Sequence, residues 1–312
     1  MDKATHHPRI AFVGLGRLGG PLAANLAEAG FHVTGYDQDP VATGRLGTER
    51  IRGADSVAAA IDDAQLVMTC VRSAADLDKV LSAPGVTEAL AGVEALLDFS
   101  TISPADSAEC AERLERHGIA FLRVAVSGSA QAAAARQVSF ICSGPKDTYE
   151  RHTALLEATG RSHTWVGTRD EARAVKIAIN MLVGVGMASL IESVALAERL
   201  GIGRQQFLDV VAGSAVGSPF FAAKTPALVA HDYTPAASLA LMKKDLDLAM
   251  AASAEAGVTL PVTQVALDLY DVCAERGWAE RDFACLDELY SASENLPSGG
   301  AAPTPQEETC RP

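Results

Sequence analysis

The chain has 312 residues and a formal net charge of −13, and 48% of its residues are hydrophobic and 21% are charged. Such a composition supplies a large apolar core, and the length is that of two domains. The chain has no run of lysine and arginine, which excludes a surface built for nucleic-acid phosphates, because that surface needs a basic stripe. We therefore expect a globular protein that holds any anionic ligand with a few local donors.

Six cysteines are spread along the chain without a CxxC pair, which argues against a zinc site and against a disulfide framework. The polar stretch 1–9 lacks the apolar segment of a signal peptide, so a cytoplasmic location is expected. The stretch 177–197 is apolar and close to the length of a membrane span. It contains Asn180 and Glu192 and is flanked by Lys176 and Arg199. We interpret it as a buried helix at a domain or subunit interface and expect no membrane association.

The first 168 residues alternate short apolar runs with helical stretches. Strands are predicted at Ile10–Val13, His32–Tyr36, Leu66–Val71, Ala95–Phe99, Ala120–Val124, Val138–Ser143 and His163–Val166. Helices are predicted between most of them, for example at Pro21–Ala29, Ala75–Leu81, Pro104–His117 and Thr148–Ala158. This alternation predicts βαβ units on a mainly parallel sheet.

The strand pattern ends after about Thr168, and only helical stretches follow. Helices are predicted at Glu171–Leu200, Arg204–Val211, Leu239–Ala256, Pro261–Glu275 and Asp282–Ser291. Gly257 and Pro261 mark the end of one helix and the start of the next. The stretch 295–312 is rich in Pro, Ser, Gly, Glu and Thr, which predicts a disordered tail. The sequence therefore predicts an α/β domain over 8–168 and an all-α domain over 169–294.

A glycine-rich turn joins the first predicted strand to the first predicted helix. Its residues are Gly14, Leu15, Gly16, Arg17, Leu18 and Gly19, in the pattern GxGxxG. Gly14 permits the tight turn, Gly16 lets the backbone approach a pyrophosphate, and Gly19 lets the helix pack on the strand. N–H groups at the helix start supply donors for that anion. The motif predicts a Rossmann-type dinucleotide-binding domain; the alternative is a structural glycine turn in an α/β protein that binds no nucleotide.

The next predicted strand ends at Tyr36-Asp37, and Asp37 lies 18 residues after Gly19. A carboxylate at this place would accept hydrogen bonds from the adenosine ribose hydroxyls and would repel a 2′-phosphate. The sequence therefore predicts NAD as the cofactor in preference to NADP.

Four blocks of sequence between residues 9 and 292 resemble the β-hydroxyacid dehydrogenase family, which includes 3-hydroxyisobutyrate dehydrogenases and tartronate semialdehyde reductases. The blocks are Gly14–Leu26, Val126–Ser129, Lys176–Asn180 and Lys244–Leu246, and the stretch Asp98–Pro104 is also similar. The resemblance implies a Rossmann-type domain followed by an all-α domain for substrate binding and dimerisation. It also implies oxidation of a small 3-hydroxy acid, or reduction of the matching semialdehyde.

The resemblance implies that Lys176 is the catalytic acid and base. Oxidation of an alcohol needs a base for the hydroxyl proton while hydride leaves for the nicotinamide, and in reverse an ammonium protonates the carbonyl oxygen. A lysine suits both directions where partial burial and a nearby nicotinamide cation lower its pKa. The alternative is a solvated surface charge at the start of a helix.

Substrate contacts are implied by two of the blocks. Asn180 lies four residues after Lys176 on the same helix face, where its amide would hold the substrate hydroxyl or orient the lysine. An interhelix or capping amide is the alternative. Ser127, Gly128 and Ser129 follow a predicted strand end, where hydroxyls and N–H groups would bind the carboxylate of a small substrate. A plain Ser/Gly turn is the alternative.

The resemblance also implies further cofactor contacts. Thr101 lies just past a strand end and would be near the nicotinamide. Val71 and Arg72 end another strand, and Arg72 replaces the usual proline. Lys244 matches a position that reaches the cofactor from the helical domain, and an ion pair with a neighbouring aspartate is its alternative role.

Several residues depart from the family pattern: Arg123, Ala125, Arg136, Asp170, Ala172 and Ile179. Ile179 replaces an amide, so the pocket should be less polar and suit a bulkier or less hydroxylated substrate. Arg123 and Arg136 are expected at the surface, with a place near the pocket as the alternative. Asp170 and Ala172 replace glycines, so the approach to the long helix should be less flexible.

Two other functions compete with hydroxy-acid oxidation. Imine reductases share a similar architecture but often lack the lysine and prefer NADP, so Lys176 and Asp37 argue against this function while Ile179 favours it. A non-catalytic dinucleotide-binding module that recognises a partner protein is disfavoured by Lys176, Asn180 and Ser127. The apolar helix and the all-α second half predict a homodimer or a higher homo-oligomer, in which subunits complete each other's clefts.

Overall fold

The computed structural model describes residues 7–44 and 51–291, and the chain divides into two compact units between Ile179 and Asn180. The strands of the first unit are β1 (Arg9–Val13), β2 (His32–Tyr36), β3 (Ile51–Gly53), β4 (Leu66–Thr69), β5 (Ala95–Asp98), β6 (Ala120–Ser127), β7 (Ser139–Ser143) and β8 (Ser162–Gly167). Its helices are α1 (Gly19–Glu28), α2 (Pro40–Gly44), α3 (Val57–Ile61), α4 (Ala74–Leu81), α5 (Val86–Ala89), η1 (Leu90–Gly92), α6 (Pro104–Glu115), α7 (Ala130–Ala134), α8 (Lys146–Arg151) and α9 (Thr153–Thr159), and α10 (Glu171–Arg199) begins in it.

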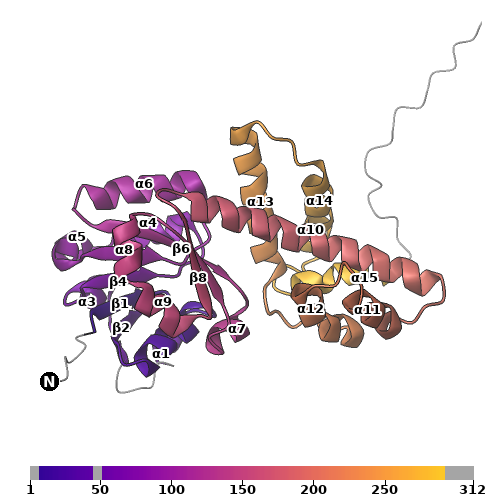
Figure 1. Ribbon diagram of the computed structural model, residues 1–312, viewed down its shortest axis with the longest axis horizontal. Helices are drawn as coiled ribbons and strands as arrows, with labels where there is room; N and C mark the ends of the chain where they lie inside the picture. Colours follow the sequence, from indigo (N-terminus) through magenta and orange to yellow (C-terminus); the bar gives the residue numbers. More distant parts are fainter. Residues whose placement is uncertain (1–6, 45–50, 292–312) are drawn as a thin grey trace, which may run out of the picture. The chain divides into compact units, whose positions relative to one another are not determined.

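The strands of the first unit form one sheet in the order β3-β2-β1-β4-β5-β6-β7-β8 (Figure 1). All neighbours are parallel except β6 and β7, which are antiparallel. The predicted Rossmann-type fold with a mainly parallel sheet is therefore confirmed. The strand order reverses between β1 and β4, and in such sheets ligands bind outside the carboxyl ends of the strands at that reversal.

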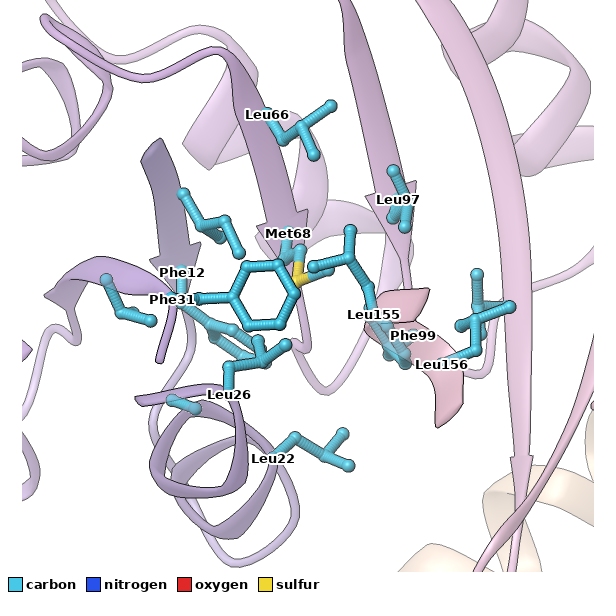
Figure 2. Packing of buried hydrophobic residues seen from close by; sticks show 14 of the residues in the cluster. Phe12, Leu22, Leu26, Phe31, Leu66, Met68, Leu97, Phe99, Leu155 and Leu156 are labelled. Carbon is cyan, nitrogen blue, oxygen red and sulfur yellow. The ribbon is translucent and has the colours of Figure 1, made fainter. Parts of the chain in front are cut away.

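Side chains from alternate strand positions build a separate core on each face of the sheet. Phe12 and its neighbours on β4 and β5 pack against α1 and α9 on one face, as Figure 2 shows. Ala11 and Val13 pack on the other face with residues of α3, α4, α5 and α6. Both cores consist of buried apolar side chains, so the sheet is a rigid platform for the loops at its carboxyl edge.

Over its described residues the second unit contains helices and no β-strand, as predicted. After α10 these are α11 (Arg204–Ala212), α12 (Pro219–Ala230), α13 (Leu239–Ala256), α14 (Pro261–Glu275), η2 (Phe283–Leu286) and α15 (Asp287–Ser291). Gly184 of α10 lies against Leu246 of α13, where a Cβ atom would approach the leucine to 2.9 Å, and Tyr270 of α14 donates a hydrogen bond to the Gly184 carbonyl. The absence of a side chain at Gly184 therefore allows α10 and α13 to pack closely.

Some elements differ from the sequence prediction. The expected helix Thr148–Ala158 is split into α8 and α9, because the backbone leaves the helical region at His152. Strand β3 was not predicted, since it has three residues and two of them are Arg and Gly. Helix α12 was not predicted either, and it contains Pro226, a residue that normally ends a helix.

The predicted boundary at 168/169 lies before α10, whereas the division into units falls within that helix. The predicted tail at 295–312 lies outside the described residues. Helix α10 is long and apolar enough to cross a membrane by length and composition, and 39% of its most apolar window is buried. Its residues Met187, Ile191 and Val194 belong to the core of the second unit, so one face of the helix is buried and the helix as a whole is less buried than predicted.

Candidate active site

The glycine-rich turn follows β1 at the sheet reversal and depends on two glycines for its shape. Gly14 has a φ of +94° and donates its N–H to the Tyr36 carbonyl at 2.9 Å. A Cβ atom at Gly14 would lie 2.3 Å from the Cys70 carbonyl oxygen, and one at Gly19 would lie 1.9 Å from the Gly14 oxygen. Because these contacts are with backbone atoms, any side chain at either position would force the turn apart.

Gly16 is different, because a Cβ atom there would meet nothing within 4 Å. The space beside it is open, and Leu18, the N-cap of α1, has no side-chain cap. The first N–H groups of a helix have no partners inside the helix, so this end of α1 offers donors to an anion. Of the other predicted loop residues, Leu15 buries its side chain in the core and Arg17 is exposed. The loop therefore fits a pyrophosphate over Gly16.

Asp37, just after β2, lies beside this turn. Its Oδ2 accepts a hydrogen bond from the Leu15 N–H at 2.7 Å, and its Oδ1 accepts one from the Asp39 N–H at 2.9 Å. A carboxylate has about four acceptor positions, so about two remain for outside donors. Two vicinal ribose hydroxyls would use these positions. Asp37 thus also fastens the glycine loop, a role that sequence reasoning did not foresee.

The glycine turn and Asp37 border one cavity of about 400 Å³ in the first unit. The predicted residues Gly14, Gly16, Asp37, Val71 and Arg72 all line it. Its remaining lining is Val13, Tyr36, Gln38, Asp39, Val57, Cys70, Asp76, Lys79, Val80 and Ala83. The structure therefore brings together residues from three predicted segments that are far apart in the sequence.

Three aspartates and two cations line this cavity. Among the described lining residues the cations are Arg72 and Lys79, and both lie within ion-pair distance of Asp76, at 3.8 and 2.9 Å.

Burial and, secondarily, Asp98 raise the pKa of the Cys70 thiol to about 12. This thiol stays protonated at neutral pH, so Cys70 is a wall of the cavity rather than a nucleophile.

The loops after β4 and β5 are joined by hydrogen bonds at the same edge of the sheet. The Val71 N–H donates to Ser100 Oγ at 3.0 Å, and Ser100 Oγ donates to Asp98 Oδ1 at 2.7 Å. Thr101, predicted near the nicotinamide, is the half-buried residue next to Ser100. The predicted contacts Val71 and Thr101 are thus held in fixed relation to each other.

The predicted carboxylate-binding turn follows β6. Ser127 is the last residue of β6 and is half-buried, and Gly128 has a φ of +141° that favours glycine. Ser129 is the N-cap of α7, and its side chain accepts a hydrogen bond from the Ala132 N–H at 3.2 Å. Ser129 Oγ therefore acts as an acceptor in the cap of α7, and its O–H group can still donate to another group.

Lys176 and Asn180 lie one turn apart on α10. Lys176 is half-buried, and Asn180 is buried with its Nδ2 donating to Asp245 Oδ2 of α13 at 2.5 Å. A carboxylate only accepts hydrogen bonds, so the amide nitrogen must face Asp245 and the amide oxygen remains available. Lys244 Nζ lies 3.1 Å from Asp245 Oδ1, so the alternative ion pair of Lys244 is present.

Two of the departures from the family pattern explain each other. Arg123 was expected at the surface, but it is buried with its Nε 2.8 Å from Asp170 Oδ1. The expectation was wrong because Asp170 supplies a counter-charge for a buried arginine. Arg136 is at the surface, as expected, and pairs with Glu28 at 2.7 Å. Neither arginine lines the cavity of the glycine turn.

Sequence reasoning included Asp245 only as part of the block Lys244–Leu246 and did not single out Arg173. The signal for Asp245 was its place in the block Lys244–Leu246. Arg173 carried no signal, because a single arginine near a helix start is ordinary. The structure makes it one of the largest fully buried side chains in the described part of the chain.

Two family models match successive parts of this chain. The model described as the NAD binding domain of 6-phosphogluconate dehydrogenase matches residues 9–167, and the model described as NAD-binding of NADP-dependent 3-hydroxyisobutyrate dehydrogenase matches residues 171–290. The 3-hydroxyisobutyrate dehydrogenase of Pseudomonas aeruginosa is 31% identical over 291 residues, which cover 90% of this chain and 98% of the relative.

Solved structures agree with these matches. The 3-hydroxyisobutyrate dehydrogenase of Mycobacterium tuberculosis with L-serine has a TM-score of 0.82 and 31% identity, covering 92% of this chain and all of that chain. An imine reductase from Pseudomonas sp. has a TM-score of 0.62 and 22% identity, over 91% of this chain and 99% of that chain, which is a likeness of fold alone. The protein therefore belongs to the β-hydroxyacid dehydrogenase family and is an NAD(P)-dependent oxidoreductase that acts on the hydroxyl groups of hydroxy acids.

Proposed function

We propose that the protein uses NAD to oxidise a small 3-hydroxy acid, or NADH to reduce the matching semialdehyde, with Lys176 as the general acid and base. The observation that carries this proposal is the fixed amide of Asn180 one helical turn from Lys176. The dinucleotide, when bound, supplies the hydride acceptor or donor. The residues of the chain then bind and orient the substrate and move its proton.

The proton step follows from the chemistry of the two side chains. Neutral Lys176 takes the proton of the substrate hydroxyl during oxidation, and its ammonium returns it to the carbonyl oxygen during reduction. Asn180 has its amide nitrogen on Asp245, so its oxygen accepts a hydrogen bond from the substrate hydroxyl or from the lysine. The carboxylate of the substrate is assigned to the turn at Ser127 and Gly128, with Ser129 in a supporting role as the helix cap.

We assign NAD in preference to NADP because of Asp37. The two remaining acceptor positions of its carboxylate match the two hydroxyls of an adenosine ribose, and a 2′-phosphate would meet the negative charges of Asp37 and Asp39. Val71, Arg72, Thr101 and Lys244 are assigned to the remaining cofactor contacts.

The Asp37→Ser variant should lose much of its preference for NADH over NADPH. We expect the ratio of kcat/KM values for the two cofactors to fall roughly 10- to 100-fold, because hydrogen bonds to a carboxylate are lost and a repulsion is removed. Asp62→Asn is the control, since Asp62 is an exposed aspartate of the same unit that does not line this cavity. An unchanged ratio in Asp37→Ser would contradict the assignment of NAD.

A substrate panel with the full chain tests the proposed function. Hydroxy acids and semialdehydes are each assayed with both cofactors, and a cyclic imine with NADPH is included because the imine reductase fold is similar. We expect turnover of 3-hydroxy acids with NAD. Imine reduction alone would replace the proposal by the imine-reductase function, and tight cofactor binding without any turnover would favour a non-catalytic module.

We also propose that the chain assembles at least as a homodimer through its helical unit. Large apolar side chains are exposed there, including Leu182 (69% exposed) and Leu196 (62%) on α10 and Val262 (65%) on α14. Burial of such side chains against a second copy would stabilise the assembly. Light scattering should give a mass of at least twice 32.5 kDa at micromolar concentration, and a stable monomer would contradict the proposal.

A further inference from the structure

A buried arginine fastens the first turn of α10 to the sheet. The Arg173 side chain is 1% exposed, and its guanidinium donates to the Asp98 carboxylate and to the Ser100 carbonyl. Its Nε also lies 3.4 Å from Ser107 Oγ on α6. One side chain therefore ties the start of the helix to the end of β5, to the loop that follows, and to α6.

The same carboxylate organises the loops that we assign to the cofactor. Asp98 Oδ1 accepts hydrogen bonds from Thr69 Oγ1 at 2.6 Å and from Ser100 Oγ at 2.7 Å. Ser100 Oγ in turn accepts from the Val71 N–H. These bonds do not involve the arginine, so the loops after β4 and β5 have their own connection. Arg173 connects the start of α10 to these loops, which are already hydrogen-bonded to each other without it.

A second ion pair holds the residue just before α10. Arg123 Nε of β6 lies 2.8 Å from Asp170 Oδ1 and 3.2 Å from Ser107 Oγ. Burial lowers the pKa of Arg123, and Asp170 opposes that change. Arg123 and Arg173 thus share Ser107, and each has its own carboxylate. The start of the helix is fixed from β5 by one pair and from β6 by the other.

We propose that Arg173 is a positioning residue for Lys176, and that the Arg123–Asp170 pair supports it in this role. This inference rests on the proposed acid–base function of Lys176. Lys176 is three residues after Arg173, a rise of about 4.5 Å along one continuous turn, so a shift of the first turn moves the lysine with it. A displacement of about 1 Å at a reacting group can lower a rate about 100-fold.

The test compares Arg173→Gln with the parent chain, using 3-hydroxyisobutyrate and NAD as the probe. We expect kcat to fall about 10- to 100-fold, with KM and the NAD dissociation constant changed less than about threefold, because the Asp98–Ser100–Val71 bonds remain. Arg173→Lys should recover part of kcat, since it keeps the charge opposite Asp98 but not the fork of donors. Hydrogen exchange of the amides in 171–179 should also accelerate in Arg173→Gln, a readout that needs no substrate.

Arg113→Gln is the matched control. Arg113 on α6 makes a comparable set of bonds, to Asp78, Leu81 and Ser82 at 2.6 to 3.0 Å, so its loss should leave kcat unchanged. If Arg173→Gln does not fold, the Asp170→Asn variant is used to test the inference. This variant should fold, and its kcat should be about threefold to tenfold lower than that of the parent chain.

The inference is overturned if folded Arg173→Gln has an unchanged kcat and an unchanged rate of hydrogen exchange. If Arg173→Gln does not fold, the same result in Asp170→Asn overturns it. An equal decrease of kcat in Arg113→Gln also overturns it. Lys176→Ala, assayed in parallel, separates the two claims. Full activity of that variant refutes the proposed function itself, whereas its inactivity beside a fully active Arg173→Gln refutes only the positioning role.

Discussion

The Lys176→Ala variant should bind NAD as the parent chain does and lose catalysis by about 10³-fold or more. General acid–base catalysis by a positioned side chain contributes about 10²- to 10⁴-fold, and the variant would have no other assigned base to take the proton of the substrate hydroxyl. Lys176 is half-buried on α10 and outside the lining of the cavity beside the glycine turn. Its removal should therefore spare cofactor binding.

The measurement is the steady-state rate of NADH formation, with NAD affinity determined by titration of the same preparations. Lys146→Ala is the control, because Lys146 is an exposed lysine of the first unit that pairs with Glu150. If the rate of NADH formation and the affinity for NAD fall by the same factor in Lys176→Ala, the lysine acts in cofactor binding. Full activity would remove it from the mechanism.

The Gly16→Ala variant should fold normally and fail to hold the cofactor. Its Cβ atom would meet nothing within 4 Å of the protein, so the free energy of unfolding should change by less than about 0.5 kcal/mol. The added methyl group would occupy the space where a pyrophosphate approaches the N–H groups of α1. Weakening of one or two such charged hydrogen bonds should raise the NAD dissociation constant roughly 10- to 100-fold.

The Gly14→Ala variant provides the contrast within the same turn. Its Cβ atom would lie 2.3 Å from a backbone oxygen at a φ of +94°, so this variant should lower the melting temperature by roughly 5 °C or more. Thermal unfolding and NAD titration of the two variants separate a binding defect from a folding defect. A Gly16→Ala variant with unchanged NAD affinity would exclude the proposed seat of the pyrophosphate.

The parts of the fold that local sequence determines were predictable. The glycine turn, the strand before it and the helix after it are contiguous, so their residue types specify the local structure directly. Gly257 and Pro261 likewise marked the end of α13 and the start of α14, since Gly257 caps α13 at a φ of +67° and Pro261 begins α14. Helix α12 was not predicted because it contains Pro226, and an interior proline normally argues against a helix.

The parts that depend on pairing between distant residues were not predictable. Arg123 and Asp170 are 47 positions apart, and each looked like an isolated departure until the structure placed their charges together. Asn180 and Asp245 are 65 positions apart, so sequence reasoning could not tell which atom of the amide would remain available. Side-chain partners of this kind are decided by packing, which a single sequence pattern does not contain.

Transfer of deuterium tests hydride transfer from a 3-hydroxy acid most directly. The full chain is incubated with NAD and 3-hydroxyisobutyrate in which both hydrogens on the hydroxyl-bearing carbon are deuterium, and the reduced cofactor is examined by mass spectrometry. Our account predicts one deuterium on the reduced cofactor for each semialdehyde formed, and loss of this product in Lys176→Ala. Reduced cofactor without deuterium, or an equal yield from Lys176→Ala, would contradict it.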